Sequence, residues 1–261
     1  MNKLKWVAIT LLVLSTQGFS SQALSSQILP PKNLPSQTKV HECVILLHGL
    51  ARSDGSFSTL ASNLSAHGYT TINYGYPSTD HNVEKLAQDA ISDALSQCPE
   101  HNQVKSQIHF VTHSMGGILV RQYLSKNTIE DLGRVVMLGP PNKGSQVVDN
   151  LKNVPGFKLI NGPAGMQLGT GEASVPNQLG PANFELGIIA GTRSINLILS
   201  TMLPGKNDGK VSVENTKLEG MTDHISLPVT HPFMMKNQKV MPQVLHFLRF
   251  GTFQRGNLRT P

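Results

Sequence analysis

The central part of the chain alternates short apolar runs with longer segments in which apolar residues recur three and four positions apart. The apolar runs predict five strands, at 43–49, 69–77, 107–112, 134–138 and 186–191. Runs without polar interruption are typical of strands buried on both faces of a parallel sheet. The helical spacing predicts helices over 57–68, over 82–98, from 115 to about 126, and over 240–251.

Strands that alternate with helices of this length indicate βαβ units. The sequence therefore predicts an α/β fold with a mostly parallel central sheet and helices on both faces. In such sheets, functional groups gather beyond the carboxyl ends of the strands. The residues that directly follow each predicted strand are therefore the candidates for chemistry.

One stretch interrupts this alternation. Fourteen of the forty-three residues from 139 to 181 are glycine or proline, and the apolar periodicity there is weak. A long connection without regular structure inside a compact domain is usually a functional lid or binding loop. We expect an insertion over 142–185 that caps the site, with a surface insertion without function as the alternative.

The first 23 residues have the order of a secretory signal. Two lysines precede a nine-residue apolar run at 6–14, and small residues follow it. Nine apolar residues are too few to span a bilayer, so a cleaved signal over 1–23 is favoured over an anchor or a buried helix. The segment 24–41 then predicts an extended tether, and 42–261 a single domain. The protein is expected in the periplasm or secreted.

Composition and charge exclude several classes of function. The chain has 261 residues, 39% of them hydrophobic and 15% charged, as in an ordinary globular domain. The net charge is +6, but the basic residues do not cluster among aromatics, so no nucleic-acid partner is predicted. No G-x-G-x-x-G follows a strand and no H-E-x-x-H or C-x-x-C is present, so neither a cofactor nor a metal site is predicted. The segment 139–145 is similar to a phosphate loop but lacks the lysine after the second glycine.

The residues from Thr112 to Gly116, THSMG, join a predicted strand to a predicted helix. They approximate the pattern G-x-S-x-G, in which a sharp turn exposes a serine hydroxyl above the amino end of a helix. Gly116 and Gly117 leave room for such a turn, whereas Thr112 departs from the pattern. Ser114 is therefore the candidate nucleophile, with a turn serine of no function as the alternative.

A serine hydroxyl needs a base to activate it, and the base needs an acid to orient it. In this pattern an acid and then a histidine follow the serine along the chain. Asp208, in an Asn-Asp-Gly turn, and His231, after the apolar stretch 225–229, satisfy that order. The sequence therefore predicts Asp208 as the acid and His231 as the base.

Other acids and histidines are the alternatives. Asp223 and Glu214 could replace the acid, and each is otherwise a surface charge. His224 could replace the base, but it precedes the apolar stretch and is expected at the other end of the sheet. His48 and His113 flank the predicted site and are expected to order its loops without exchanging protons.

Attack by a serine on a carbonyl forms an oxyanion that needs hydrogen-bond donors. One donor is expected at the backbone N–H of Met115, the residue after the serine. The other is expected in the loop after the first strand, where Gly49 lets the chain turn and leaves the N–H of Leu50 facing the site.

The segments LLHGLARS, VTHSMGG, LGPPNKGS, NDGKVSV and VTHPFM occur in this order within residues 42–250. Together they resemble the α/β-hydrolase superfamily, and within it the serine lipases and esterases. The resemblance implies Ser114 as nucleophile, Asp208 as acid and His231 as base. Leu50 and Met115 would form the oxyanion hole. It also implies hydrolysis of carboxylic esters through an acyl-enzyme, with an acyltransferase or a non-catalytic binding protein on the same scaffold as alternatives.

The same resemblance places the two cysteines, Cys43 and Cys98, at the end of the sheet opposite the site. There they form either a disulfide, which export to an oxidising compartment would favour, or two small core residues. The apolar segments of the predicted cap favour lipid or short acyl esters as substrates. Transient contact with a membrane surface is the further interaction that we expect.

Overall fold

The structure, a computed structural model, describes residues 42–99 and 106–256. The predicted signal at 1–23 and the predicted tether at 24–41 lie outside the described residues. The described residues belong to one compact unit, Val40–Pro261. None of the helices in this part of the chain has both the length and the apolar character needed to cross a lipid bilayer.

Six parallel strands form one sheet. The strands are β1 (Glu42–Leu47), β2 (Thr70–Tyr74), β3 (Gln107–His113), β4 (Leu132–Leu138), β5 (Leu186–Gly191) and β6 (Asp223–Leu227). Their order across the sheet is β2-β1-β3-β4-β5-β6, and each neighbouring pair runs parallel. The predicted parallel sheet is therefore confirmed. β6 begins at Asp223, so His224 lies at the amino end of this strand, the end of the sheet away from Ser114, as the sequence predicts.

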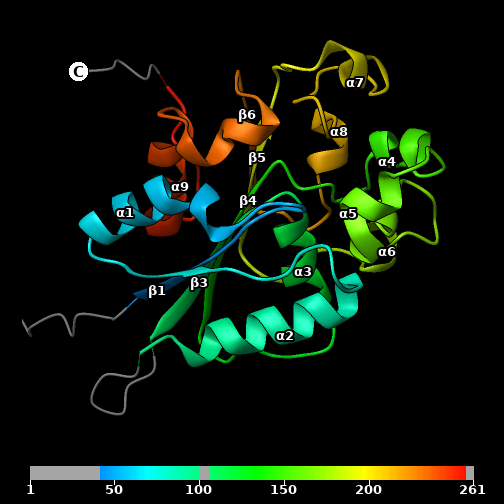
Figure 1. Ribbon diagram of the computed structural model, residues 1–261. Coiled ribbons are helices and arrows are strands. Elements are labelled where there is room, and N and C mark those ends of the chain that lie inside the picture. The colour runs from blue at the N-terminus through cyan, green and yellow to red at the C-terminus, as the bar shows by residue number, and fades with distance from the viewer. Residues whose placement is uncertain (1–41, 100–105, 257–261) are drawn as a thin grey trace, which may run out of the picture. The chain divides into compact units, whose positions relative to one another are not determined.

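Two helices cover each face of the sheet (Figure 1). The helices α2 (Val83–Ser96) and α3 (Met115–Leu124) pack on one face, and α1 (Ser58–Ala66) and α9 (Val240–Phe250) pack on the other. Successive side chains of a strand point to opposite faces, so β1 contributes Ile45 and Leu47 to one core and Val44 and Leu46 to the other. This double burial explains why the run is apolar without alternation.

The helix ends follow from local chemistry. The side chain of Asn82 accepts a hydrogen bond from the N–H of Lys85 and so caps the first turn of α2. Gly251 adopts a left-handed conformation, with φ of 72°, and ends α9. The predicted boundaries of both helices are therefore close to the observed ones.

The insertion after β4 corrects the sequence prediction. It is not a connection without regular structure, because it contains the helices α4 (Gln146–Leu151), α5 (Phe157–Met166) and α6 (Val175–Gln178). Its glycines and prolines fall where a helix tolerates them. Pro176 lies in the first turn of α6, and Gly162 breaks the helical backbone inside α5 just before Pro163.

Buried hydrogen bonds hold this insertion against α3, on one face of the sheet. Arg121 of α3 is buried, and its guanidinium donates to the backbone and side-chain oxygens of Asn142 and to the carbonyls of Pro176 and Gly180. Burial lowers the pKa of Arg121 to about 10, so it remains a cation at neutral pH. One side chain thus ties both ends of the insertion to a core helix.

Four shorter helical turns complete the part of the chain that the structure describes. They are η1 (Asp54–Ser56), α7 (Leu197–Thr201), α8 (Val213–Thr216) and η2 (His231–Lys236). The turn η1 follows β1, α7 and α8 follow β5, and η2 follows β6. All four therefore belong to loops that leave the carboxyl ends of strands.

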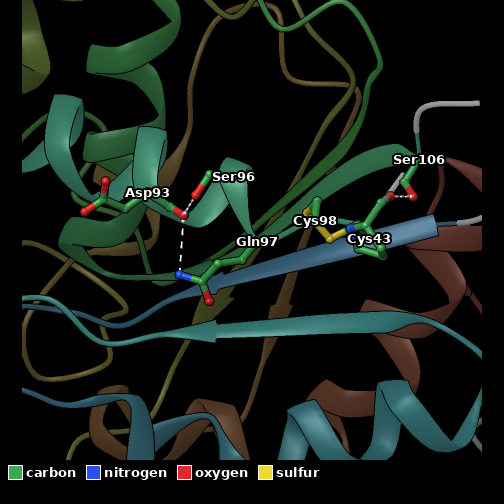
Figure 2. The surroundings of a disulfide bond; sticks show 7 residues. Cys43, Asp93, Ser96, Gln97, Cys98 and Ser106 are labelled. Atoms are coloured by element: carbon green, nitrogen blue, oxygen red, sulfur yellow. Dashed lines mark hydrogen bonds between the residues drawn. A yellow bond between two sulfur atoms is a disulfide. The ribbon is translucent and has the colours of Figure 1, made fainter. Parts of the chain in front are cut away.

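Cys43 and Cys98 form a disulfide (Figure 2). Cys43 is the second residue of β1, and Cys98 follows the end of α2. Because Ser114 follows the last residue of β3 and the strands are parallel, the disulfide lies at the opposite end of the sheet. It links a central strand to the helix that returns the chain to the next strand.

Candidate active site

Ser114 occupies a sharp turn between β3 and α3. Its φ of 53° and ψ of −122° are rare for a residue with a side chain. Its N–H donates to the carbonyl of Leu138 over 2.9 Å, and its own carbonyl accepts from the N–H of Gly117 over 3.1 Å. The turn is therefore held on both sides by backbone hydrogen bonds.

The glycines after Ser114 allow α3 to approach the strands closely. A Cβ atom at Gly116 would clash with the carbonyl oxygen of Leu47, at the end of β1. A Cβ atom at Gly117 would lie 2.9 Å from the sulfur of Met137 and 3.2 Å from Oγ1 of Thr112. Thr112, which replaces the first glycine of the pattern, thus fits beside a residue without a side chain.

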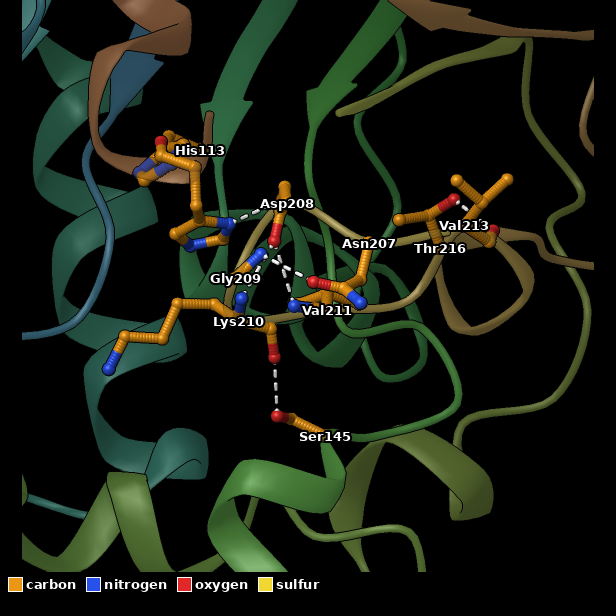
Figure 3. A network of polar contacts seen from close by, with 10 residues as sticks. His113, Ser145, Asn207, Asp208, Gly209, Lys210, Val211, Val213 and Thr216 are labelled. Atoms are coloured by element: carbon orange, nitrogen blue, oxygen red, sulfur yellow. Dashed lines mark hydrogen bonds and ion pairs between the residues drawn. The ribbon is translucent and has the colours of Figure 1, made fainter. Parts of the chain in front are cut away.

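Asp208 and His231 are in direct contact. Nδ1 of His231 donates to Oδ2 of Asp208 over 2.7 Å, and both residues are buried. The other carboxylate oxygen accepts from the N–H groups of Lys210 (2.9 Å) and Val211 (2.8 Å), as Figure 3 shows. The N–H of His231 also donates to the carbonyl of Asp208 over 3.1 Å. The carboxylate is therefore fixed, and the proton on Nδ1 leaves Nε2 of His231 as an acceptor.

The alternative residues lie in other environments. Glu214 is exposed and pairs with Lys217. Asp223 lies at the amino end of β6, where it pairs with Arg255. His224 shares a hydrogen bond with the hydroxyl of Thr216 over 3.0 Å. The structure brings none of the three alternatives into contact with His231.

Glycines at the ends of two strands make room for the Asp208–His231 pair. Gly139, after β4, has a φ of 55°, and a Cβ atom there would lie 2.9 Å from Oδ2 of Asp208 and 3.1 Å from Nδ1 of His231. A Cβ atom at Gly191, the last residue of β5, would lie 2.7 Å from Cβ of Asp208. Larger residues at either position would displace the pair.

His113 supports the backbone of His231. Its Nε2 lies 2.9 Å from the carbonyl oxygen of His231, and the centres of the two rings are 4.6 Å apart. Burial, and then the neighbouring His231, lower the pKa of His113 well below its usual value. The neutral ring therefore donates from Nε2 to this carbonyl.

His48 and Tyr76 order the loop after β1. Nδ1 of His48 donates to the carbonyl of Gly49, and its Nε2 accepts from the N–H of Tyr76. The hydroxyl of Tyr76 donates to the carbonyl of His48 over 2.5 Å, and the two rings stack with centres 4.1 Å apart. Burial lowers the pKa of His48, which favours this neutral form.

The two predicted oxyanion donors are Leu50, in this loop, and Met115, at the start of α3. Across residues 42–99 and 106–256, the N–H groups of both residues have no hydrogen-bond acceptor. Ala51, directly after Leu50, has a φ of 52°, and its N–H donates to the hydroxyl of Ser78. The hydrogen bond from Ala51 to Ser78 thus holds the loop, while the N–H of Leu50 stays available to a ligand.

A cavity of about 360 Å³ joins these residues. Ser114, His113, His231 and Leu50 line it. The insertion supplies an apolar wall, made of Val147, Val148, Phe157, Ile160 and Leu168. In the described part of the chain, no hydrogen bond joins Oγ of Ser114 to His231. Such bonds are often long in ligand-free enzymes and tighten when substrate binds.

Two cationic side chains also line the cavity, and the sequence motifs do not single them out. Arg52 follows Leu50 by two residues, and Lys210 follows Asp208 by two. Their positions in loops that the sequence predicts to reach the site are the signal that could have identified them. Among the described residues, no three His, Cys, Asp or Glu side chains gather in a way that could hold a metal ion.

Comparison with known proteins gives a family and a fold. The sequence profile of the alpha/beta hydrolase family matches residues 44–203, a range that includes Ser114 but ends before Asp208. The comparison with curated proteins found no significant match.

Solved structures of similar fold include the mature form of a lipase from Bacillus licheniformis. It is 20% identical, with 84% of this chain and 96% of that chain covered and a TM-score of 0.60. A metagenomic carboxyl esterase is 18% identical, with 79% and 70% covered and a TM-score of 0.56. A phospholipase from Legionella pneumophila is 19% identical, with 67% and 45% covered and a TM-score of 0.51. At these identities the similarity establishes the α/β-hydrolase fold.

Proposed function

Because the chain belongs to the alpha/beta hydrolase family, we propose that it is a serine hydrolase that cleaves carboxylic esters. The observation that carries the proposal is the 2.7 Å hydrogen bond from His231 to the buried Asp208, because His231 and Ser114 line the same cavity. A buried carboxylate that orients a histidine beside a serine is the arrangement that activates a hydroxyl for attack on a carbonyl.

In the proposed reaction, Nε2 of His231 takes the proton of the Ser114 hydroxyl as Oγ attacks the ester carbonyl. The carbonyl oxygen becomes an oxyanion and accepts hydrogen bonds from the N–H groups of Leu50 and Met115, both of which are free of other acceptors in the described chain. His231 then gives its proton to the leaving alcohol, and an acyl-enzyme remains.

Water completes the proposed cycle. His231 removes a proton from the water as it attacks the acyl-enzyme, and returns that proton to Ser114 when the acid leaves. Asp208 keeps His231 oriented throughout, since both of its oxygens accept hydrogen bonds. His113 is a positioning residue, because it holds the carbonyl of His231 and contacts no reacting atom in this scheme.

The lining of the cavity supports esters with an apolar acyl chain. Five apolar side chains of the insertion face the space next to Ser114, and the cavity volume suits a small ligand. The lipase and the carboxyl esterase of similar fold support carboxylic esters as the substrate class.

We also propose that the protein is exported. The predicted signal at 1–23 supports this proposal. The disulfide between Cys43 and Cys98 supports it further, because disulfides persist mainly in oxidising compartments.

The test combines covalent labelling with activity measurements. The purified protein is treated with a fluorophosphonate probe and assayed on p-nitrophenyl esters of increasing chain length. We expect labelling and hydrolysis by the wild type. We expect neither label nor activity above roughly a thousandth of wild type in Ser114→Ala.

Ser62→Ala is the matched control, because Ser62 is an exposed serine on α1. It is expected to keep wild-type labelling and activity. A wild type that takes no label and hydrolyses none of the esters would refute the enzyme proposal. Activity that survives Ser114→Ala would refute the nucleophile.

A further inference from the structure

Two positive charges stand at the rim of the cavity. Arg52 and Lys210 both line it, and both side chains are exposed, so their charged ends lie where the cavity opens to solvent. Figure 3 shows the side chain of Lys210 extending away from Asp208. The two cations come from different loops, one after β1 and the other after β5.

Neither cation has a partner in the described part of the chain. The guanidinium of Arg52 and the ammonium of Lys210 form no hydrogen bond or ion pair with any described residue. No residue that lines the cavity is acidic. Asp54 is the nearest acid along the sequence to Arg52, and it neither lines the cavity nor pairs with that residue.

The two charges influence each other. Partial desolvation at the rim, followed by the positive charge of Arg52, lowers the pKa of Lys210. The positive charge of Arg52 also lowers the pKa of His113. The negative charge of Asp208 raises the pKa of Lys210. It offsets the effect of Arg52 only in part, because the carboxylate of Asp208 is buried and bonded to His231. An anion placed between the two cations would relieve their repulsion.

We propose that Arg52 and Lys210 form a binding site for an anionic group, a carboxylate or a phosphate, carried by the ester substrate. The inference rests on the proposed esterase function and names its substrate class. The apolar wall of the insertion would hold the acyl chain, while the charged group of the same molecule stays at the rim, between the loop of Leu50 and the loop of Asp208.

The charge can sit on either part of the ester, and two matched pairs of substrates separate these cases. Mono-p-nitrophenyl glutarate and p-nitrophenyl pentanoate differ by a carboxylate on the acyl side. Butanoylglycerol phosphate and butanoylglycerol differ by a phosphate on the alcohol side. The readout for each pair is the ratio of kcat/KM for the charged ester to that for the neutral one.

We expect the ratio of at least one pair to fall roughly three- to fivefold in Arg52→Gln and in Lys210→Gln, and about tenfold in the double variant. Because the readout is a ratio within each variant, any change in activity that the charged and the neutral ester share cancels from it. Added salt should lower the wild-type ratio and leave that of the double variant nearly constant, because it screens exposed charges. Lys126→Gln, a change of an exposed lysine just after α3 that does not line the cavity, is the control and should keep the wild-type ratio.

Failure of this inference can be told apart from failure of the proposed function. If the esters are hydrolysed but both ratios in the double variant stay within twofold of those in Lys126→Gln, the anion site is refuted and the esterase proposal stands. If the wild type hydrolyses nothing, ligand-observed NMR with glutarate and glycerol phosphate decides. Binding to the wild type that is lost in the double variant supports the anion site, and absent or equal binding overturns it.

Discussion

Ser114 holds a backbone conformation that costs on the order of 1–3 kcal/mol for a residue with a side chain. Hydrogen bonds to Leu138 and from Gly117 hold the turn in place. Gly116, which has no side chain, lets α3 approach the end of β1. The strain is therefore supported by contacts on three sides, as is expected where a turn must present a side chain to a ligand.

Replacing Asp208 by asparagine tests the role of the carboxylate. The substitution keeps the size of the side chain but removes the charge that orients His231 and stabilises its protonated form. We expect kcat for p-nitrophenyl esters to fall by about 10³- to 10⁴-fold, with little change in KM. Steady-state kinetics measure the effect.

Glu214→Gln is the control for this change, since Glu214 is an exposed acid that the sequence alone leaves as an alternative. It should retain wild-type kcat. The assignment of Asp208 fails if Asp208→Asn keeps more than a tenth of wild-type activity, or if Glu214→Gln causes the larger loss.

At the scale of single residues, the sequence motifs identify the candidate nucleophile, acid and base, because these must follow one another in a fixed order along the chain. Ser114 and His231 each follow an apolar run, and Asp208 lies in an Asn-Asp-Gly turn between them, so these three positions can be seen in the sequence. The role of Arg52 and Lys210 cannot be seen in the same way, because it depends on two loops, far apart in the chain, that line one cavity. The support that His113 gives to His231 depends equally on tertiary structure.

At the scale of elements, the sheet and its four covering helices could be predicted, whereas the helices of the insertion could not. The core helices bury a regular apolar face, and their caps lie at their ends. The helices α4, α5 and α6 are short and lie among glycines and prolines, so local propensity argues against them. They are held instead by contacts such as those of Arg121, which the sequence does not reveal.

The connection after β4 gives a prediction at this scale. Gly139→Ala places a methyl group against Asp208 and His231, at a φ of 55° that alanine rarely adopts. We expect a loss of roughly 1–3 kcal/mol in the free energy of unfolding and a fall of at least tenfold in kcat/KM. Urea unfolding and ester hydrolysis measure the two effects.

Gly171→Ala is the matched control, because a Cβ atom there meets nothing within 4 Å. It should leave stability and activity near those of the wild type. If Gly139→Ala is as stable and as active as this control, the close packing described around the Asp208–His231 pair is wrong.

At the scale of the whole molecule, the disulfide is a source of stability far from the site. Cys43 and Cys98 are 55 positions apart, so the bond closes a long loop in the unfolded chain. We expect the paired change Cys43→Ala with Cys98→Ala to lower the free energy of unfolding by about 2–4 kcal/mol. Urea unfolding measures the loss, and kcat/KM of the folded variant should stay within about twofold of wild type. Unchanged stability would show that the bond does not constrain the unfolded chain as expected.

Buried histidines make the stability of the molecule depend on pH. His109 lies inside the sheet, where its Nδ1 accepts from the N–H of Arg134 over 2.8 Å. Burial, followed by the positive charge of Arg134, lowers the pKa of His109 from 6.5 to about 4. The pKa values of His48, His113 and His224 are lowered as well, with burial as the main cause in each.

A lowered histidine pKa has a definite sign for stability. Between pH 6.5 and pH 4 the unfolded chain binds a proton at residue 109, whereas the folded chain does not. Stability must therefore fall as the pH is lowered through this range, by up to about 3 kcal/mol for His109 alone. Glu42, which lies 3.6 Å from Nε2 of His109, acts in the opposite direction, because burial raises its pKa. Glu42 is partly exposed, so its effect is the smaller one.

We therefore expect the free energy of unfolding, measured in urea at several pH values, to fall between pH 7 and pH 4.5. In His109→Asn, which keeps an acceptor near the N–H of Arg134 but cannot be protonated, the slope against pH should be shallower. The variant is also expected to be less stable at neutral pH, so the slope, and not the absolute stability, is the test. His81→Asn, a change of an exposed histidine, should keep the wild-type slope. A His109→Asn slope equal to that of the wild type would mean that His109 takes up its proton in the folded chain as readily as in the unfolded one.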